Sequence, residues 1–158
     1  MRILIVDDHA VVRQGIKLII SDMKMPVEIA EAGNGSEAIR LLRDGKWDMV
    51  LLDINLPGKN GIEVLKQIKS EWKKLPVLML SMYSEDQYAM RAIRSGAAGY
   101  MTKETAADEL LNAIDKVTRG GRYISAAVAE KLVFDRDESG EEMPHHELSD
   151  REYEVLRF

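Results

Sequence analysis

Ile3-Leu-Ile-Val6 is followed directly by Asp7 and Asp8, and this pattern of an apolar run that ends in polar side chains decides the fold. The run is rich in branched aliphatic residues and lacks polar alternation, which is typical of a strand buried on both faces of a sheet. Three later runs have the same form. They are Met49–Leu52 before Asp53, Val77–Leu80 before Ser81, and Ala98–Thr102 before Lys103.

Amphipathic segments separate these runs, and each is long enough to form a helix that crosses from one strand to the next. Crossover helices make neighbouring strands parallel. Because the carboxyl ends of parallel strands lie at one edge of the sheet, where ligands bind, the polar side chains after the runs are expected to meet in one pocket. The sequence therefore predicts an α/β fold with a doubly wound parallel sheet.

Five β/α units are expected to be complete by residue 119, with a short second strand at Val27–Ala30. Two helix starts carry capping residues: Asn34, to which Glu37 three residues later can reach back, and Thr105. The other elements expected are a strand at Arg2–Val6 and helices at Ala10–Ser21, Ile62–Trp72 and Ser125–Phe134.

The composition is that of an ordinary globular protein. At 158 residues, with 46% hydrophobic and 31% charged residues, there is room for one average domain and an appendage. The absence of cysteine excludes a disulfide framework, a thiolate metal site and a cysteine nucleophile. The first residues lack a signal-peptide pattern and no run reaches about 18 apolar residues, so a cytoplasmic protein without a membrane span is expected.

The net charge of −5 is concentrated in the tail. Residues 1–134 carry 19 basic and 18 acidic side chains, whereas residues 135–158 carry 3 and 9. The composition therefore gives no basic stripe of the kind that binds nucleic acid. Residues 135–147 are acidic, contain Gly140 and Pro144 and have little to bury, which predicts a linker.

The expected pocket contains groups suited to phosphoryl transfer. A carboxylate that accepts a phosphoryl group needs a divalent cation to neutralise charge, and Mg²⁺ prefers oxygen ligands. Asp8 and Asp53 are expected to bind this metal directly, and Asp7 directly or through water. A main-chain carbonyl just after the third run, such as that of Asn55, would complete the protein ligands.

Lys103 and Ser81 suit two oxygens of the phosphoryl group in such a site. Each candidate also has an ordinary structural explanation: Asp8 and Ser81 can cap helices, Asp53 can lie in a loop, and Lys103 can be solvated. Three carboxylates packed together without a cation would repel one another, which favours a shared functional site.

The ordered motifs of residues 1–120 resemble those of the receiver domain of bacterial two-component response regulators. The resemblance implies a flavodoxin-like sheet of five parallel strands in the order 2-1-3-4-5. Two departures from the family pattern are mild, with Ser81 where threonine is commoner and Leu56 where methionine often precedes proline. The motifs are Val6-Asp7-Asp8-His9, Leu52-Asp53 with Leu56-Pro57 and Gly61, Ser81, and Tyr100-Met-Thr-Lys103.

The same resemblance implies a role for each motif residue. Asp53 corresponds to the aspartate that a histidine kinase phosphorylates, and Lys103 to the lysine that binds the phosphoryl group. Ser81 and Tyr100 correspond to a switch pair, in which the hydroxyl moves toward the phosphate and the aromatic ring turns inward. The Mg²⁺ ligands implied are Asp7, Asp8, Asp53 and the main-chain carbonyl of Asn55.

Residues 148–158 resemble the opening helix of the LuxR-type DNA-binding domain of NarL/FixJ response regulators. Ser149 and Glu152 in this stretch form a capping box. Arg119–Ser125 is similar to the passage into the linker in the same group. The domains expected are a receiver at 1–120, a linker with a short helix at 121–147, and the first helix of a truncated helix-turn-helix domain at 148–158, which ends within that element.

The predicted function is a phosphorylation-controlled transcription regulator, not an enzyme, that promotes its own phosphorylation and dephosphorylation. The expected partners are a sensor histidine kinase, a second copy of the chain on phosphorylation, and promoter DNA through a complete effector domain. This chain alone is not expected to bind DNA, because the helix that enters the major groove would lie after Phe158. No membrane partner is expected.

Three other classes remain as alternatives. A phosphatase of the haloacid dehalogenase type also uses an aspartyl phosphate, but such enzymes carry Asp-x-Asp after the first strand, whereas Asp7 and Asp8 are adjacent. A nucleotide or flavin binder is disfavoured because neither a Gly-x-Gly-x-x-Gly nor a Gly-Lys-Ser/Thr loop follows any run. A stand-alone receiver that acts by protein contact is disfavoured by the linker and the capping box.

Overall fold

The computed structural model describes residues 1–82 and 86–139. In these residues five parallel strands form one sheet in the order β2-β1-β3-β4-β5, which confirms the predicted topology. The short second strand lies at one edge and pairs with the full length of β1. The strands are β1 Arg2–Val6, β2 Glu28–Ala32, β3 Met49–Asp53, β4 Val77–Ser81 and β5 Gly99–Thr102.

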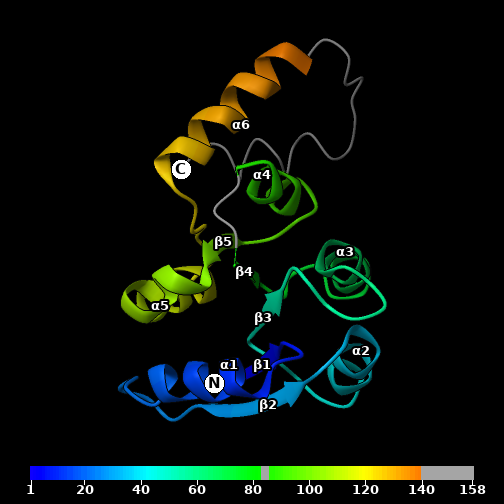
Figure 1. Ribbon diagram of the computed structural model, residues 1–158, viewed down its shortest axis with the longest axis vertical. Helices are drawn as coiled ribbons and strands as arrows, with labels where there is room; N and C mark the ends of the chain where they lie inside the picture. Colours follow the sequence, from blue (N-terminus) through cyan, green and yellow to red (C-terminus); the bar gives the residue numbers. More distant parts are fainter. Residues whose placement is uncertain (83–85, 140–158) are drawn as a thin grey trace.

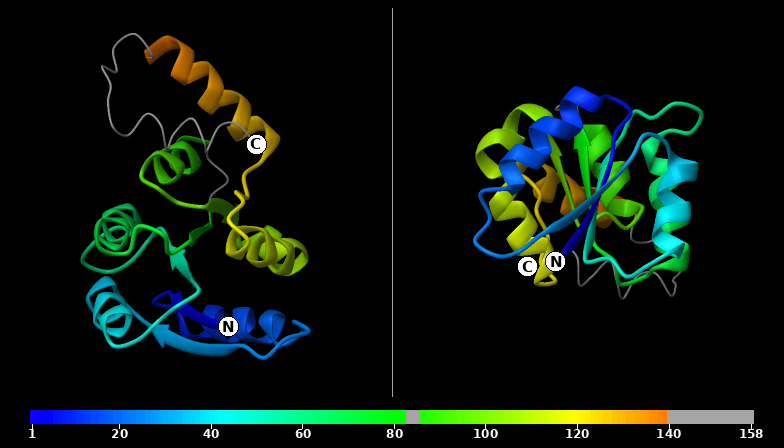
Figure 2. Two further views of the ribbon diagram at one scale, coloured as in Figure 1. Left: turned by 180° about the vertical axis from the view of Figure 1, so that it is seen from behind. Right: turned by 90° about the horizontal axis from the view of Figure 1, so that it is seen from below.

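Helices cover both faces of this sheet, as the doubly wound arrangement requires. Figure 1 shows α1 and α5 on one face and α2, α3 and α4 on the other, with α6 beside α4. Figure 2 shows the same layers from behind and from below. In the described part of the chain, no helix is both long enough and apolar enough to cross a membrane. The helices are α1 Ala10–Ile20, α2 Gly35–Arg43, α3 Gly61–Glu71, α4 Asp86–Arg94, α5 Lys103–Thr118 and α6 Ala126–Ser139.

The core consists of two apolar clusters, one on each face of the sheet. Successive side chains of a strand point to opposite faces, so Ile3 and Ile5 join the cluster under α1 and α5, whereas Leu4 and Val6 join the other. Every residue of β3 and β4 is buried. The apolar runs therefore form central strands because both of their faces are covered.

The helix caps agree with the sequence only in part. Asn34 caps α2, and its Oδ1 accepts the Glu37 N–H at 2.8 Å. The Glu37 carboxylate reaches back one residue further than expected and accepts the Gly33 N–H at 2.7 Å. The prediction that Thr105 caps α5 is wrong, because Thr102 is the cap and its Oγ1 accepts the Thr105 N–H at 3.1 Å. Lys103 is therefore the first residue of α5.

One cap and two element boundaries also differ from the expected ones. The N-cap of α1 is His9, which makes no side-chain capping bond, so Asp8 is not the cap of this helix. Strand β2 begins after Val27 and runs to Ala32, because its pairing with β1 continues to Val6. Helix α6 continues to Ser139, past the expected end at Phe134 and into the acidic segment. The expected helix at 148–158 lies outside the described residues.

The outer edge of β5 is paired with the chain that follows α5. The Tyr100 N–H donates to the Tyr123 carbonyl at 3.0 Å, and the Tyr123 N–H donates to the Ala98 carbonyl at 2.9 Å. This close approach requires glycine at position 99, where a Cβ would lie 2.6 Å from the Tyr123 carbonyl oxygen. The bridge leads directly into α6, whose Val128 joins the core cluster beside α4.

We expect Gly61→Ala to lower the free energy of unfolding by about 1–3 kcal/mol, because the new methyl group would overlap the Asp53 carbonyl oxygen and the Ile54 Cα. Urea unfolding of the purified protein measures this change. Gly15→Ala is the matched control, since its Cβ meets nothing within 4 Å inside α1 and should raise stability by about 0.5–1 kcal/mol. Equal stabilities of the two variants would contradict the close packing at Gly61.

Burial and the Glu109 carboxylate, which accepts the Tyr123 hydroxyl at 3.0 Å, raise the pKa of Tyr123 to about 12. The unfolded chain therefore releases this proton near pH 10, before the folded protein does. The free energy of unfolding should not change with pH through this group below pH 10 and should fall between pH 10 and 12. Ultraviolet titration measures the shift, and Tyr123→Phe should remove one tyrosine that ionises near pH 12; an unchanged titration curve would contradict it.

Candidate active site

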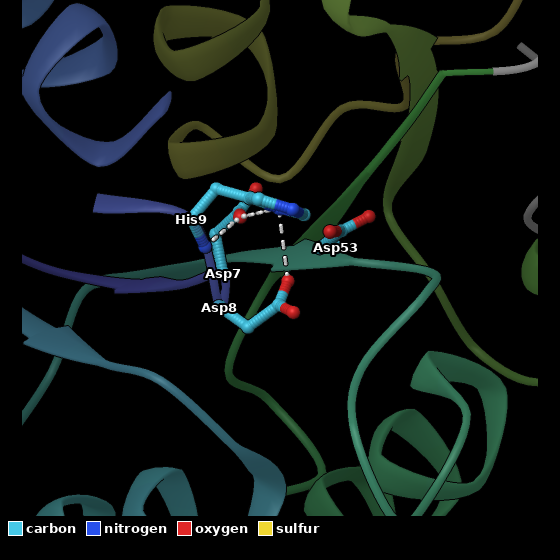
Figure 3. A group of neighbouring side chains, drawn as sticks. All are labelled: Asp7, Asp8, His9 and Asp53. Carbon is cyan, nitrogen blue, oxygen red and sulfur yellow. Dashed lines mark hydrogen bonds and ion pairs between the residues drawn. The ribbon is translucent and has the colours of Figure 1, made fainter. Parts of the chain in front are cut away.

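Three carboxylates gather at the carboxyl edge of the sheet. Asp53 is the last residue of β3, and Asp7 and Asp8 follow β1, whose Val6 pairs with Leu52 of β3. Each of these side chains and His9 offers an atom within 4.8 Å of the others. Figure 3 shows Asp53 beside the loop that carries the other three residues. Adjacent parallel strands therefore bring together acids that are 45 residues apart in the sequence.

The Lys103 ammonium lies between two of the acids. Its Nζ is 2.9 Å from Asp7 Oδ2 and 3.1 Å from Asp53 Oδ2. Both carboxylates are 2% exposed, and the lysine side chain is 14% exposed. Because Thr102 caps α5, the helix starts at Lys103 itself and the lysine projects from the helix start at the same edge. The geometry is that of a buried, compensated charge cluster.

Burial dominates the protonation of the acid at the end of β3. It raises the pKa of Asp53, and the Asn55 N–H and the Lys103 ammonium offset this rise only in part. Burial also disfavours the charged form of Lys103, but its close contacts with the Asp7 and Asp53 carboxylates outweigh burial and raise the pKa of the ammonium. The lysine is therefore held in its charged form between the two acids.

Main-chain donors orient the two buried acids. The His9 N–H donates to Asp7 Oδ1 at 2.8 Å, and the Asn55 N–H donates to Asp53 Oδ1 at 3.2 Å. The His9 Nδ1 also lies 3.1 Å from Asp8 Oδ1. His9 was not among the predicted site residues, although its position directly after the acid pair was a signal that its side chain would lie near them.

The acid cluster has the character of a magnesium site. Asp7 Oδ2 is buried and has the Lys103 ammonium as its ionic neighbour, but it has no well-directed hydrogen bond. The three acids present only oxygen ligands, which is the donor type that Mg²⁺ prefers. Since they are opposed by one ammonium group, negative charge remains that a divalent cation would neutralise. The cluster therefore fits the metal that the sequence indicated.

The remaining predicted site residues lie on β4 and β5. Ser81 is fully buried at the last position of β4, one residue beyond the partner of Asp53 in the register. Tyr100 lies on β5, is 8% exposed, and joins the core cluster on the face of α2, α3 and α4. It also lines a cavity of about 370 Å³ with Tyr123 and Val128. Tyr100 therefore shares a cavity with Val128 of α6.

The chain has a clear similarity to a known family. Residues 3–115 match the model of the response regulator receiver domain. The chain is 33% identical to the response regulator UvrY of Escherichia coli K12 over 157 residues, which cover 99% of this chain and 72% of UvrY. It is 34% identical over 155 residues to the response regulator GacA of Pseudomonas protegens, with 98% and 73% covered.

A solved structure has the same fold. The crystal structure of a LuxR-family two-component response regulator from Aurantimonas sp. SI85-9A1 superposes with a TM-score of 0.76 and 34% identity, and the match covers 85% of this chain and 96% of that one. The chain is also 32% identical to the transcriptional regulatory protein DegU of Brevibacillus brevis over 174 residues, which cover 100% of this chain and 74% of DegU.

We expect Lys103→Met to lower the free energy of unfolding by about 3 kcal/mol at neutral pH with a chelator present, because it leaves Asp7 and Asp53 buried without a counter-charge. Urea unfolding measures the loss. Adding Asp53→Asn should restore part of it by removing one of the two charges. Lys59→Met, which removes an exposed lysine bonded to Gln67, should change little. A loss of equal size in the two lysine variants would contradict the compensation.

Proposed function

The chain belongs to the response regulators, with a receiver domain over residues 3–115 and relatives of the NarL/FixJ type, and from this premise we propose that Asp53 is the residue that accepts the phosphoryl group. One observation carries the proposal: the Asp53 carboxylate is buried beside an acid pair, and a lysine ammonium contacts it at 3.1 Å. Within the described residues, this is the cluster in which a nucleophilic carboxylate, a cation-binding acid pair and a lysine meet.

In the proposed reaction, an oxygen of Asp53 attacks the phosphorus of a phosphohistidine on a sensor kinase. A bond forms between this oxygen and phosphorus, and the bond between phosphorus and the imidazole nitrogen breaks. The imidazole leaves with the electron pair. Before the reaction, the Lys103 ammonium neutralises negative charge on the Asp53 carboxylate. After the transfer, it would neutralise negative charge on the oxygens of the phosphoryl group instead.

The three acids would also hold the metal ion. Asp8 and Asp53 would hold Mg²⁺ directly, with Asp7 and the main-chain carbonyl of Asn55 assisting. When bound, this ion supplies charge neutralisation between donor and acceptor. The Asn55 N–H keeps one oxygen of Asp53 oriented, and the His9 N–H does the same for Asp7. The chain acts as a phosphoacceptor that promotes its own phosphorylation and dephosphorylation through these groups.

Ser81 and Tyr100 would carry the change to the surface. Ser81 is buried at the end of the strand next to Asp53, where its hydroxyl can approach a new phosphoryl group. Tyr100 lies against the cavity beneath α6, so a change in its ring position would alter the packing of that helix. Phosphorylation would then shift an existing equilibrium at the surface formed by α4, β5 and α5 and favour a homodimer.

The proposed domain order is a receiver at 1–120, a linker at 121–147 and the first helix of a LuxR-type domain at 148–158. Regulators of this family receive phosphoryl groups from sensor kinases and act on DNA. Promoter DNA would be bound through a LuxR-type effector domain. The transition between linker and effector lies outside the described residues.

Incubation with acetyl phosphate and Mg²⁺ tests the phosphoacceptor. We expect one acid-labile phosphoryl group per chain by intact-protein mass spectrometry, lost in Asp53→Ala and absent with excess chelator. Asp44→Ala, which removes an acid at the end of α2, is the matched control and should be labelled like the wild type. An acid-stable product, or labelling that persists in Asp53→Ala, would refute the assignment; sustained turnover of a phosphate ester would favour the phosphatase alternative.

A further inference from the structure

We infer that Arg13 is a positioning residue for the metal site: it ties the loop of Asp7, Asp8 and His9 to the edge strand β2 and so maintains the affinity for Mg²⁺. The inference rests on the proposed function, since it concerns the same acid cluster. It adds residues that touch neither the phosphoacceptor nor the lysine. Arg13 belongs to α1, and its anchor Glu31 belongs to β2.

The guanidinium of Arg13 makes two directed bonds from different nitrogens. Its Nη1 donates to the main-chain carbonyl of Asp7, and its Nε donates to Glu31 Oε1 at 2.9 Å. The other oxygen of Glu31 accepts the Lys17 ammonium at 2.9 Å. The Arg13 side chain is 19% exposed, so these bonds are shielded from most of the solvent. Glu31 therefore anchors Arg13, and Arg13 holds the peptide that follows Asp7.

That peptide controls where the ligands point. The carbonyl that accepts the Arg13 bond belongs to the peptide that links Asp7 to Asp8. Two residues after Asp7, the His9 N–H donates to Asp7 Oδ1 at 2.8 Å. A shift of this peptide would move both acids of the pair relative to Asp53. Residues that orient metal ligands without touching the metal typically change affinity by about 10- to 100-fold when they are lost.

Loss of the Arg13 charge and loss of its bond to the Asp7 carbonyl would change the affinity for Mg²⁺ in opposite directions, so the two effects can be distinguished by experiment. Removal of a cation near three carboxylates would, by electrostatics alone, strengthen the binding of Mg²⁺. Loss of the tie to Asp7 would weaken it. Lys17 separates the two effects, because it shares the Glu31 carboxylate but bonds to that residue rather than to the Asp7 loop.

The experiment is a titration of the isotope-labelled, unphosphorylated chain with MgCl₂, followed by the amide resonances of residues 7–9 and 53–55. We expect Arg13→Met to weaken Mg²⁺ binding about tenfold and to speed hydrogen exchange of the His9 amide. Arg13→Lys should also weaken binding, because one ammonium cannot replace two nitrogens of the fork. Lys17→Met and Arg43→Met, which breaks the separate Arg43–Glu71 pair, should bind as the wild type or slightly more tightly.

Unchanged or tighter binding in Arg13→Met, with the wild type responding to Mg²⁺, would overturn the positioning role and leave the phosphoacceptor proposal intact. Failure of the wild type itself to respond would overturn the metal site and this inference together. Equal weakening in Arg13→Met and Arg43→Met would also overturn the role, since it would indicate a general loss of structure. If Arg13→Met does not fold, Arg13→Lys decides between the same outcomes, because it keeps the charge.

Discussion

The buried contact of the Lys103 ammonium with Asp7 and Asp53 is the constraint on which the rest of the structure depends. Carboxylates that are almost fully buried repel one another and resist ionisation unless a positive charge lies between them. The positive charge comes from Lys103, which directly follows β5, whereas the two acids lie at the ends of β1 and β3. These three strands therefore have to end at the same edge of the sheet. The parallel topology delivers this alignment, and the two core clusters keep it rigid.

Much of this arrangement was predictable because strand ends are a strong signal. Runs such as Met49–Leu52 have no polar alternation, so they must be buried on both faces, and a parallel sheet then places Asp7, Asp53 and Lys103 at one edge. Local capping was less predictable. Thr102 and Thr105 both suit a helix cap, and the choice between them depends on where β5 ends, which neighbouring strands determine.

The contacts that support the site were not predictable from the chain alone. Arg13 and Glu31 are charged residues on a helix and an edge strand, where side chains usually face the solvent, and nothing in their spacing indicates that they pair. Their association follows from the register of β2 against β1, which brings Glu31 beside the start of α1. The full length of α6 was not predictable either, because its last residues, 135–139, are polar and carry no apolar pattern.

The pairing of Tyr123 with the outer edge of β5 has a practical consequence for protein engineering. A natural place to join a foreign output module to this receiver domain would be directly after α5, where the repeating β/α pattern stops. That junction would strip the sheet of its border and leave unsatisfied backbone groups open to pairing with other molecules. A fusion point beyond α6 keeps the border closed, so it is the better place to join chimeric regulators.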